Sequence, residues 1–96
     1  MNKLPIGFED LQAELARELP SLIEDCVQRA RAAMTGGSLE EATRAAHRLR
    51  GTAGTLGFPD VSAAAGALED ALLGHAGGTT PKEEVLSAAG RLAEVS

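Results

Sequence analysis

The sequence contains no tryptophan and no tyrosine, and only two phenylalanines among its 96 residues. Basic stretches therefore lack aromatic stacking platforms, and the net charge of −5 also opposes binding to nucleic acid. The single cysteine, Cys26, excludes an internal disulfide and is expected in the core. No apolar run approaches the roughly 20 residues of a membrane span, and the N-terminus lacks a signal-peptide core. We therefore expect a cytoplasmic protein that binds neither nucleic acid nor membrane.

Hydrophobic residues make up 44% of the chain, and alanine and leucine dominate them. Valine and isoleucine are too few for many strands, so the composition is typical of a helical bundle with a slim core. A chain of 96 residues has room for one small domain, and we expect residues 1–96 to form it as a monomer.

Proline and glycine divide the chain into helical segments. Apolar residues at helical spacing predict a helix over residues 8–19. Pro20 suits the first turn of a second helix over residues 20–34, and one helix kinked at Pro20 is the alternative. The Thr-Gly-Gly sequence at residues 35–37 ends this segment.

Two further helices carry clear end signals. Ser38 and Glu41 match a capping box that begins a third helix, and Gly57 is placed to end it. Pro59 opens a fourth helix, which a glycine-rich connection at residues 74–80 follows.

The last helix follows this connection. Thr80, Pro81 and Glu83 have the residue types of the N-cap, first and third positions of that helix. Short joins between amphipathic helices favour antiparallel neighbours. The predicted fold is therefore all-α, an antiparallel four-helix bundle with a short extra N-terminal helix.

His47 is the residue in the third helix that needs an explanation. It lies about 130° from the centre of the apolar stripe, so we expect its ring to face out of the bundle. Glycines on the same side remove side chains beside the ring, so that a partner can approach it closely. A plain surface histidine is the alternative. The outward side also carries Glu40, Thr43, Arg44, Gly51 and Gly54, with Arg50 on its flank.

Three chemistries can use such a histidine. A metal site is disfavoured, because only Glu40, Glu41 and the distant His75 could join it. A nucleophile-and-base pair with Thr43 is disfavoured, because an exposed helix face has no enclosed pocket. The third chemistry is that of a phosphoryl carrier, which needs a free ring nitrogen and nearby positive charge. That charge is present in Arg44, Arg48 and Arg50.

The segment AHRLRGTAGTLGF at residues 46–58 resembles the signature of histidine-containing phosphotransfer (HPt) domains of bacterial two-component phosphorelays. It is also similar to the phosphotransfer domain of chemotaxis histidine kinases. The matching positions are His47, Leu49, Arg50, Gly51, Ala53, Leu56 and Gly57, and beyond them Val61, Leu68 and Glu69.

The resemblance implies specific roles. His47 would accept a phosphoryl group from a response-regulator receiver domain or a histidine kinase and pass it to a receiver aspartate. Glu69 would accept a hydrogen bond from the imidazole, and Arg50 matches the lysine that usually lies beside the phosphate. The partner would dock on the face around the histidine. The docking residues would be Thr43, Arg44, Arg48, Gly51 and Gly54.

The resemblance also implies that the chain depends on its partners. The consecutive Glu40 and Glu41 point to different sides of their helix, so they are not suited to Mg²⁺. We expect no metal or cofactor on this chain, Mg²⁺ in the partner receiver domain, and no ATP turnover by the protein alone.

Two other interpretations remain open at this point. One is a helical adaptor that docks receiver domains or a kinase and whose histidine is never phosphorylated. The other is an excised piece of a larger kinase, although Met1 favours a stand-alone or trimmed chain. Gly66 either permits close helix packing or borders the His47 site, and His75 is expected to be a surface or helix C-terminal residue.

Overall fold

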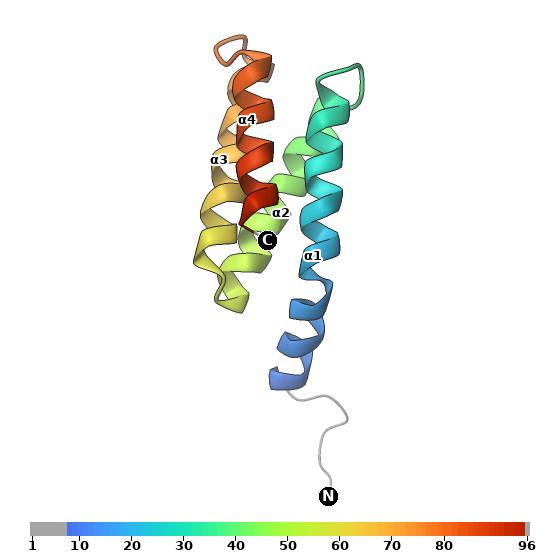
Figure 1. The fold of residues 1–96 in the computed structure, drawn as a ribbon, viewed down its shortest axis with the longest axis vertical. Helices are drawn as coiled ribbons and strands as arrows, with labels where there is room; N and C mark the ends of the chain where they lie inside the picture. The colour runs from blue at the N-terminus through green and yellow to red at the C-terminus, as the bar shows by residue number, and fades with distance from the viewer. Residues whose placement is uncertain (1–7, 96) are drawn as a thin grey trace, which may run out of the picture.

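The computed structural model describes residues 8–95, which form four helices. They are α1 (Phe8–Ala33), α2 (Leu39–Leu56), α3 (Pro59–Ala76) and α4 (Lys82–Glu94). The helices run alternately up and down (Figure 1), and each packs against two others. Helix α1 contacts α2 and α4, and α3 contacts the same two. The predicted all-α four-helix bundle is confirmed, and no helix within residues 8–95 is long and apolar enough to cross a membrane.

Residues 8–33 form one helix. The prediction of a separate short helix over residues 8–19 is therefore wrong. Helix α1 continues through Pro20, the alternative that the sequence left open. Proline inside a helix removes one hydrogen bond at a cost of about 3 kcal/mol. Leu19 and Ile23, on either side of the proline, are buried in the core, while Pro20 itself faces solvent. Core packing on both sides therefore outweighs the local break.

Helix α1 is much longer than its neighbour α4. Its 26 residues span roughly 39 Å, against roughly 20 Å for the 13 residues of α4. Its first turns consequently extend past the end of α4 (Figure 1), and Leu11 remains 45% exposed. Leu15, one turn further on, is only half-buried. This overhang places apolar side chains of α1 beside the C-terminal half of α2.

The ends of α2 follow the sequence signals. The Ser38 hydroxyl accepts a hydrogen bond from the Glu41 N–H at 3.1 Å, which caps the first turn. The Glu41 carboxylate accepts a hydrogen bond from Arg29 of α1 at 3.1 Å, which ties the two helices together. Gly57 ends the helix with φ of 86°, a left-handed conformation that suits glycine. The predicted N-cap and stop of this helix are confirmed.

The junction between α3 and α4 differs from the prediction in two ways. Helix α3 continues to Ala76, so Gly74 and His75 belong to its last turn and not to the connection. Helix α4 begins at Lys82 with Pro81 at its N-cap, so the prediction that Thr80 caps it is wrong. The Thr80 N–H donates to the Gly74 carbonyl at 3.2 Å, and its side chain packs over Gly74. Thr80 therefore closes α3 instead of opening α4.

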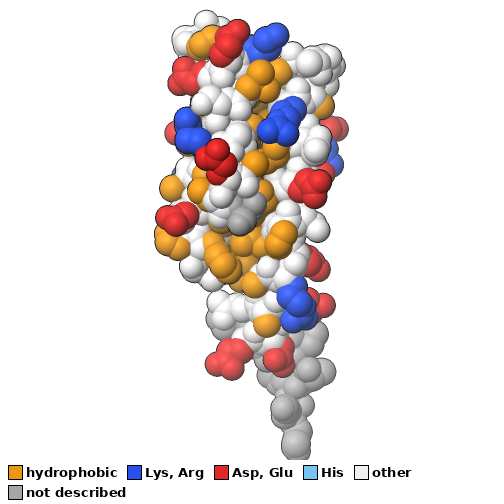
Figure 2. Space-filling model, viewed as in Figure 1, with side chains coloured by type: hydrophobic (Ala, Val, Ile, Leu, Met, Phe, Trp, Pro, Cys, Tyr) orange, Lys and Arg blue, Asp and Glu red, His pale blue; other side chains and the backbone are white. Residues whose placement is uncertain are grey.

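Alanine and leucine form most of the core, which allows the helices to approach closely. The largest fully buried side chains are Leu68, Leu72, Leu92, Val85 and Cys26. Burial, with the nearby Asp25, raises the pKa of the Cys26 thiol to about 11. Figure 2 shows hydrophobic side chains gathered along the middle of the face that carries α1 and α4, with charged residues on its flanks. Cys26 is a core residue, as expected.

Candidate functional site

His47 lies on the outer surface of α2, with its side chain 68% exposed. Ala46 and Leu49, beside it in the sequence, are buried in the core, so the helical period turns the imidazole outward. The structure thus places His47 on the accessible side that the apolar stripe indicates.

A buried carboxylate on the neighbouring helix orients the ring. Glu69 of α3 is only 9% exposed, and its Oε2 lies 2.8 Å from Nδ1 of His47. Because a carboxylate only accepts hydrogen bonds, Nδ1 carries the hydrogen and donates it. In the neutral ring, Nε2 then holds the lone pair. Among the described residues, the imidazole makes its hydrogen bond through Nδ1. Nε2 is therefore available to a reactant.

Arg50 completes the arrangement from one turn further along α2. Its Nη1 donates to Oε1 of Glu69 at 2.9 Å, while His47 occupies Oε2. Both oxygens of the carboxylate are therefore engaged by donors, and its negative charge faces the guanidinium. A buried carboxylate without such partners would be costly. The three side chains form one hydrogen-bonded unit across the α2–α3 interface.

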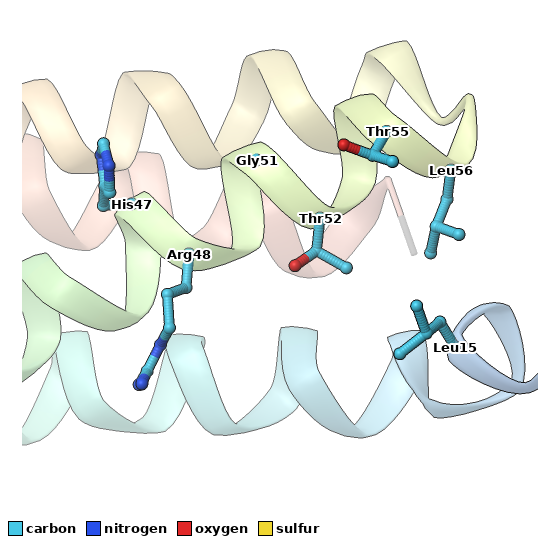
Figure 3. A pocket seen from close by; sticks show the side chains of 7 residues that line it. All are labelled: Leu15, His47, Arg48, Gly51, Thr52, Thr55 and Leu56. Carbon is cyan, nitrogen blue, oxygen red and sulfur yellow. The ribbon is translucent and has the colours of Figure 1, made fainter. Parts of the chain in front are cut away.

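Two hollows flank His47, one on each side of α2. The α1–α2 hollow has a volume of about 450 Å³ and extends toward the overhang of α1 (Figure 3). In Figure 3, Leu15 of α1 and Leu56 of α2 point toward each other at one end, and His47 stands at the other. Its lining residues are Leu15, His47, Arg48, Gly51, Thr52, Thr55 and Leu56.

The α2–α3 hollow lies on the opposite side of the imidazole and has a volume of about 570 Å³. Leu73, 52% exposed, contributes apolar surface from α3. Arg44, on its edge, is paired with Glu40 at 2.8 Å. Its lining residues are Leu39, Glu40, Thr43, Arg44, His47, Glu69, Leu73 and Ala76.

The predicted docking residues are divided between these surfaces. Arg48 and Gly51 line the α1–α2 hollow, whereas Thr43 and Arg44 line the α2–α3 hollow. Gly51 has open space where a side chain would begin. Gly54 lines neither hollow. It faces α3 instead, since a Cβ there would lie 3.3 Å from the Ser62 hydroxyl. Gly54 therefore makes room for α3, although it is exposed to solvent.

The structure also bears on the chemistries that the sequence disfavoured. The Thr43 hydroxyl donates to the Leu39 carbonyl of its own helix at 2.8 Å, so its proton is already engaged. His75 is held at the far end of α3, with Nδ1 2.9 Å from the Thr80 carbonyl. Within residues 8–95, no group of three or more His, Cys, Asp or Glu side chains is arranged to hold a metal ion.

A family model described as the Hpt domain matches residues 9–95. The chain belongs to the Hpt domain family. No curated protein and no solved structure matches the chain. Hpt domains are phosphocarriers of two-component signalling that interact with receiver domains or kinases, and they are not enzymes. The family resemblance seen in the sequence is thus confirmed.

Sequence reasoning missed several residues of this Hpt bundle. The apolar walls of the hollows, such as Leu15 and Leu73, require knowledge of how α1 and α3 pack against α2. The contact of Ser62 with the Arg50 backbone was also missed, and the role of Gly66, which lies against the Arg50 side chain, was left open. Their spacing of four residues, with Glu69 three residues later, places all three on one side of a helix. This alignment of small and polar residues was the available signal.

Proposed function

We propose that His47 is the phosphoacceptor of a phosphorelay intermediate. One observation carries the proposal: Glu69 accepts a hydrogen bond from Nδ1 of His47 at 2.8 Å, while the His47 side chain remains 68% exposed. The nitrogen with the lone pair, Nε2, is therefore the nucleophile. This is the orienting role that an acid plays for a catalytic histidine, used here on an open surface.

The transfer step follows from this geometry. The Nε2 lone pair attacks the phosphorus of a receiver aspartyl phosphate, so that an N–P bond forms. The bond between phosphorus and the aspartate oxygen breaks, and the aspartate leaves as a carboxylate. The hydrogen on Nδ1 stays on the ring, and Glu69 stabilises the positive charge that develops there. Return of the phosphoryl group to a second receiver reverses these steps.

The partner supplies the remaining catalysis. The loose transition state of phosphoryl transfer needs Mg²⁺ and a cation near the equatorial oxygens. The described residues offer no three-ligand acidic cluster for the metal. We propose that the receiver domain brings Mg²⁺ and that the chain alone does not turn over ATP. Arg44 and Arg48 add positive charge on the two sides of His47.

The docking surface comprises the two hollows, with the open backbone at Gly51 in the first of them. It is small and solvent-accessible, which suits a transient contact with a receiver domain or a histidine kinase. We propose that the protein acts in the cytoplasm as a monomer and offers this one surface to donor and acceptor in turn. Competition between donor and acceptor follows from the shared surface.

Incubation with a panel of phosphorylated receiver domains tests the proposal. The expected result is a phosphoryl group on the protein that is acid-labile and base-stable, as a phosphohistidine is. When an unphosphorylated receiver is added, the protein should lose this phosphoryl group as the receiver gains it. Receiver binding without phosphoryl uptake would instead support the helical adaptor. Incorporation of phosphate from ATP by the pure protein would contradict the carrier role.

A further inference from the structure

Three residues on one side of α3 contact the same arginine of α2. We call Ser62, Gly66 and Glu69 the α3 stripe, because their spacing of four and three residues places them in line along the helix. The backbone carbonyl of Arg50 contacts Ser62, and its aliphatic stem lies against Gly66. Its guanidinium donates to Glu69. The arginine thus lies along the stripe over its full length.

Ser62 fixes the backbone of Arg50. Its hydroxyl donates to the Arg50 carbonyl at 2.9 Å, in a contact that crosses from α3 to α2. The same hydroxyl lies 3.3 Å from the position that a Cβ on Gly54 would occupy. A side chain at Gly54 would therefore crowd the hydroxyl that makes this hydrogen bond.

Gly66 provides the space for the stem of Arg50. A Cβ added at Gly66 would lie 3.2 Å from Cδ of the arginine and 3.8 Å from its Nε. The first distance is tight, so Cδ of the arginine would have to shift by a few tenths of an ångström, whereas the second is an ordinary contact. The stem crosses α3 at this glycine and reaches Glu69, where Nη1 lies 2.9 Å from Oε1.

The contacts end at the imidazole. Glu69 is held from one side by Arg50 and holds His47 from the other, with one oxygen for each. A displacement of the guanidinium would release the first oxygen and let the carboxylate rotate. The direction of the Nδ1 hydrogen bond would then be less well defined.

We propose that Ser62 and Gly66 are positioning residues for phosphotransfer, which act by holding Arg50 against Glu69. Arg50 in turn fixes the carboxylate that selects the reactive nitrogen of His47. In this arrangement Arg50 works through Glu69 and is not primarily a ligand of the phosphoryl group. The inference rests on the proposed function of His47, but its structural part can be measured without any phosphoryl donor.

Gly66→Ala, Ser62→Ala and Arg50→Met are the test variants. Gly90→Ala is the matched control, because Gly90 lies within α4 and has nothing within 4 Å of an added Cβ. Ring ¹⁵N shifts of His47 in the unphosphorylated protein report which nitrogen carries the hydrogen. A kinetic assay with a phosphorylated receiver reports transfer, and thermal unfolding followed by circular dichroism reports the fold.

We expect the wild type and Gly90→Ala to hold the hydrogen on Nδ1 and to transfer at equal rates. The three test variants should show a mixture of the two ring tautomers. Transfer should fall by about 10-fold in Arg50→Met, the lower end of the loss found when a partner that orients a metal-bound histidine is removed, and by less in the other two. Arg50→Lys should restore part of the loss, since it keeps the charge but not the fork of donors.

An unchanged tautomer in Arg50→Met, combined with slower transfer, would overturn the inference and make Arg50 a direct ligand of the phosphoryl group. Equal behaviour of Gly66→Ala and Gly90→Ala in both assays would also overturn it. Failure of the proposed function looks different: no protein, wild type included, would take up phosphate, while the tautomer shifts would still appear.

Discussion

The two histidines of the described chain make the same kind of hydrogen bond in different surroundings. Nδ1 lies 2.8 Å from Glu69 in His47 and 2.9 Å from the Thr80 carbonyl in His75. Both acceptors fix the hydrogen on Nδ1, so both rings direct the lone pair of the neutral form to Nε2. A defined tautomer therefore does not by itself distinguish a reactive histidine from a structural one.

The difference lies in charge and access. The acceptor of His47 is a carboxylate, which can stabilise positive charge on the ring, whereas the acceptor of His75 is a neutral carbonyl. Gly51, one turn beyond His47, leaves open space, whereas Gly74, next to His75, is covered by Thr80. His75 serves to close the end of α3, and His47 is presented between two hollows.

Replacement of each histidine gives the largest expected effect. His47→Gln should remove all acid-labile phosphate uptake from a phosphorylated receiver. His75→Gln should retain the uptake, with a small loss of stability from the missing bond to Thr80, about 1 kcal/mol. Label on the His47→Gln protein, measured under the same conditions, would show that another residue is the acceptor.

Replacing the Glu69 carboxylate by a neutral group gives His47 an uncharged hydrogen-bond acceptor, as the Thr80 carbonyl is for His75. Glu69→Gln keeps the shape of the side chain but removes the negative charge that faces the ring. We expect the rate of phosphoryl uptake to fall by about 100-fold, because the developing positive charge loses its partner. Rapid-quench kinetics with one receiver measures the rate. A rate within twofold of the wild type would show that the carboxylate charge is not used.

A side chain in the open space beside His47 should hinder the approach of a partner to the imidazole. Gly51→Leu should slow transfer about 10-fold without loss of stability, because a Cβ at this position has nothing within 4 Å and leucine favours the helix more than glycine does. Gly54→Leu is the contrasting variant, since it meets Ser62 and should destabilise the bundle by about 1–3 kcal/mol. Urea unfolding and receiver transfer separate the two effects. Equal transfer in Gly51→Leu and the wild type would exclude docking at this position.

Cys26 extends the comparison to a nucleophile that is fully enclosed. Burial raises the pKa of its thiol from 9.0 to about 11. Alkylation near pH 8 should therefore be about 100-fold slower than for a free thiol. As the pH rises, the thiol of the unfolded chain ionises before that of the folded chain. Its contribution to stability is therefore present below about pH 9 and is lost as the pH rises to about 11. Fast alkylation of the folded protein would contradict this burial.

Local signals predicted most of the fold and part of the site. The spacing of leucines and alanines gave the helices, Ser38 and Gly57 gave the ends of α2, and the same spacing turned His47 outward. These features depend on neighbours within a few residues of one another. The placement of Pro20 inside α1 was decided by core packing on both sides, which local propensity does not contain.

The contacts that give His47 its surroundings are long-range, and this is why they escaped prediction from spacing. Glu69 is 22 residues from His47 and 19 from Arg50, so their meeting depends on the register of α2 against α3. Only the family resemblance pointed to Glu69. Thr80 was misassigned for a related reason, because its backbone and side chain close α3 through Gly74 and do not cap α4.

The most direct test of the central claim is ³¹P and ¹⁵N NMR of the protein after phosphorylation by a receiver domain. We predict a single phosphohistidine at His47, with phosphorus on Nε2 and hydrogen retained on Nδ1. A phosphoryl group on Nδ1 of His47, or on His75, would contradict the proposed role of Glu69 and His47.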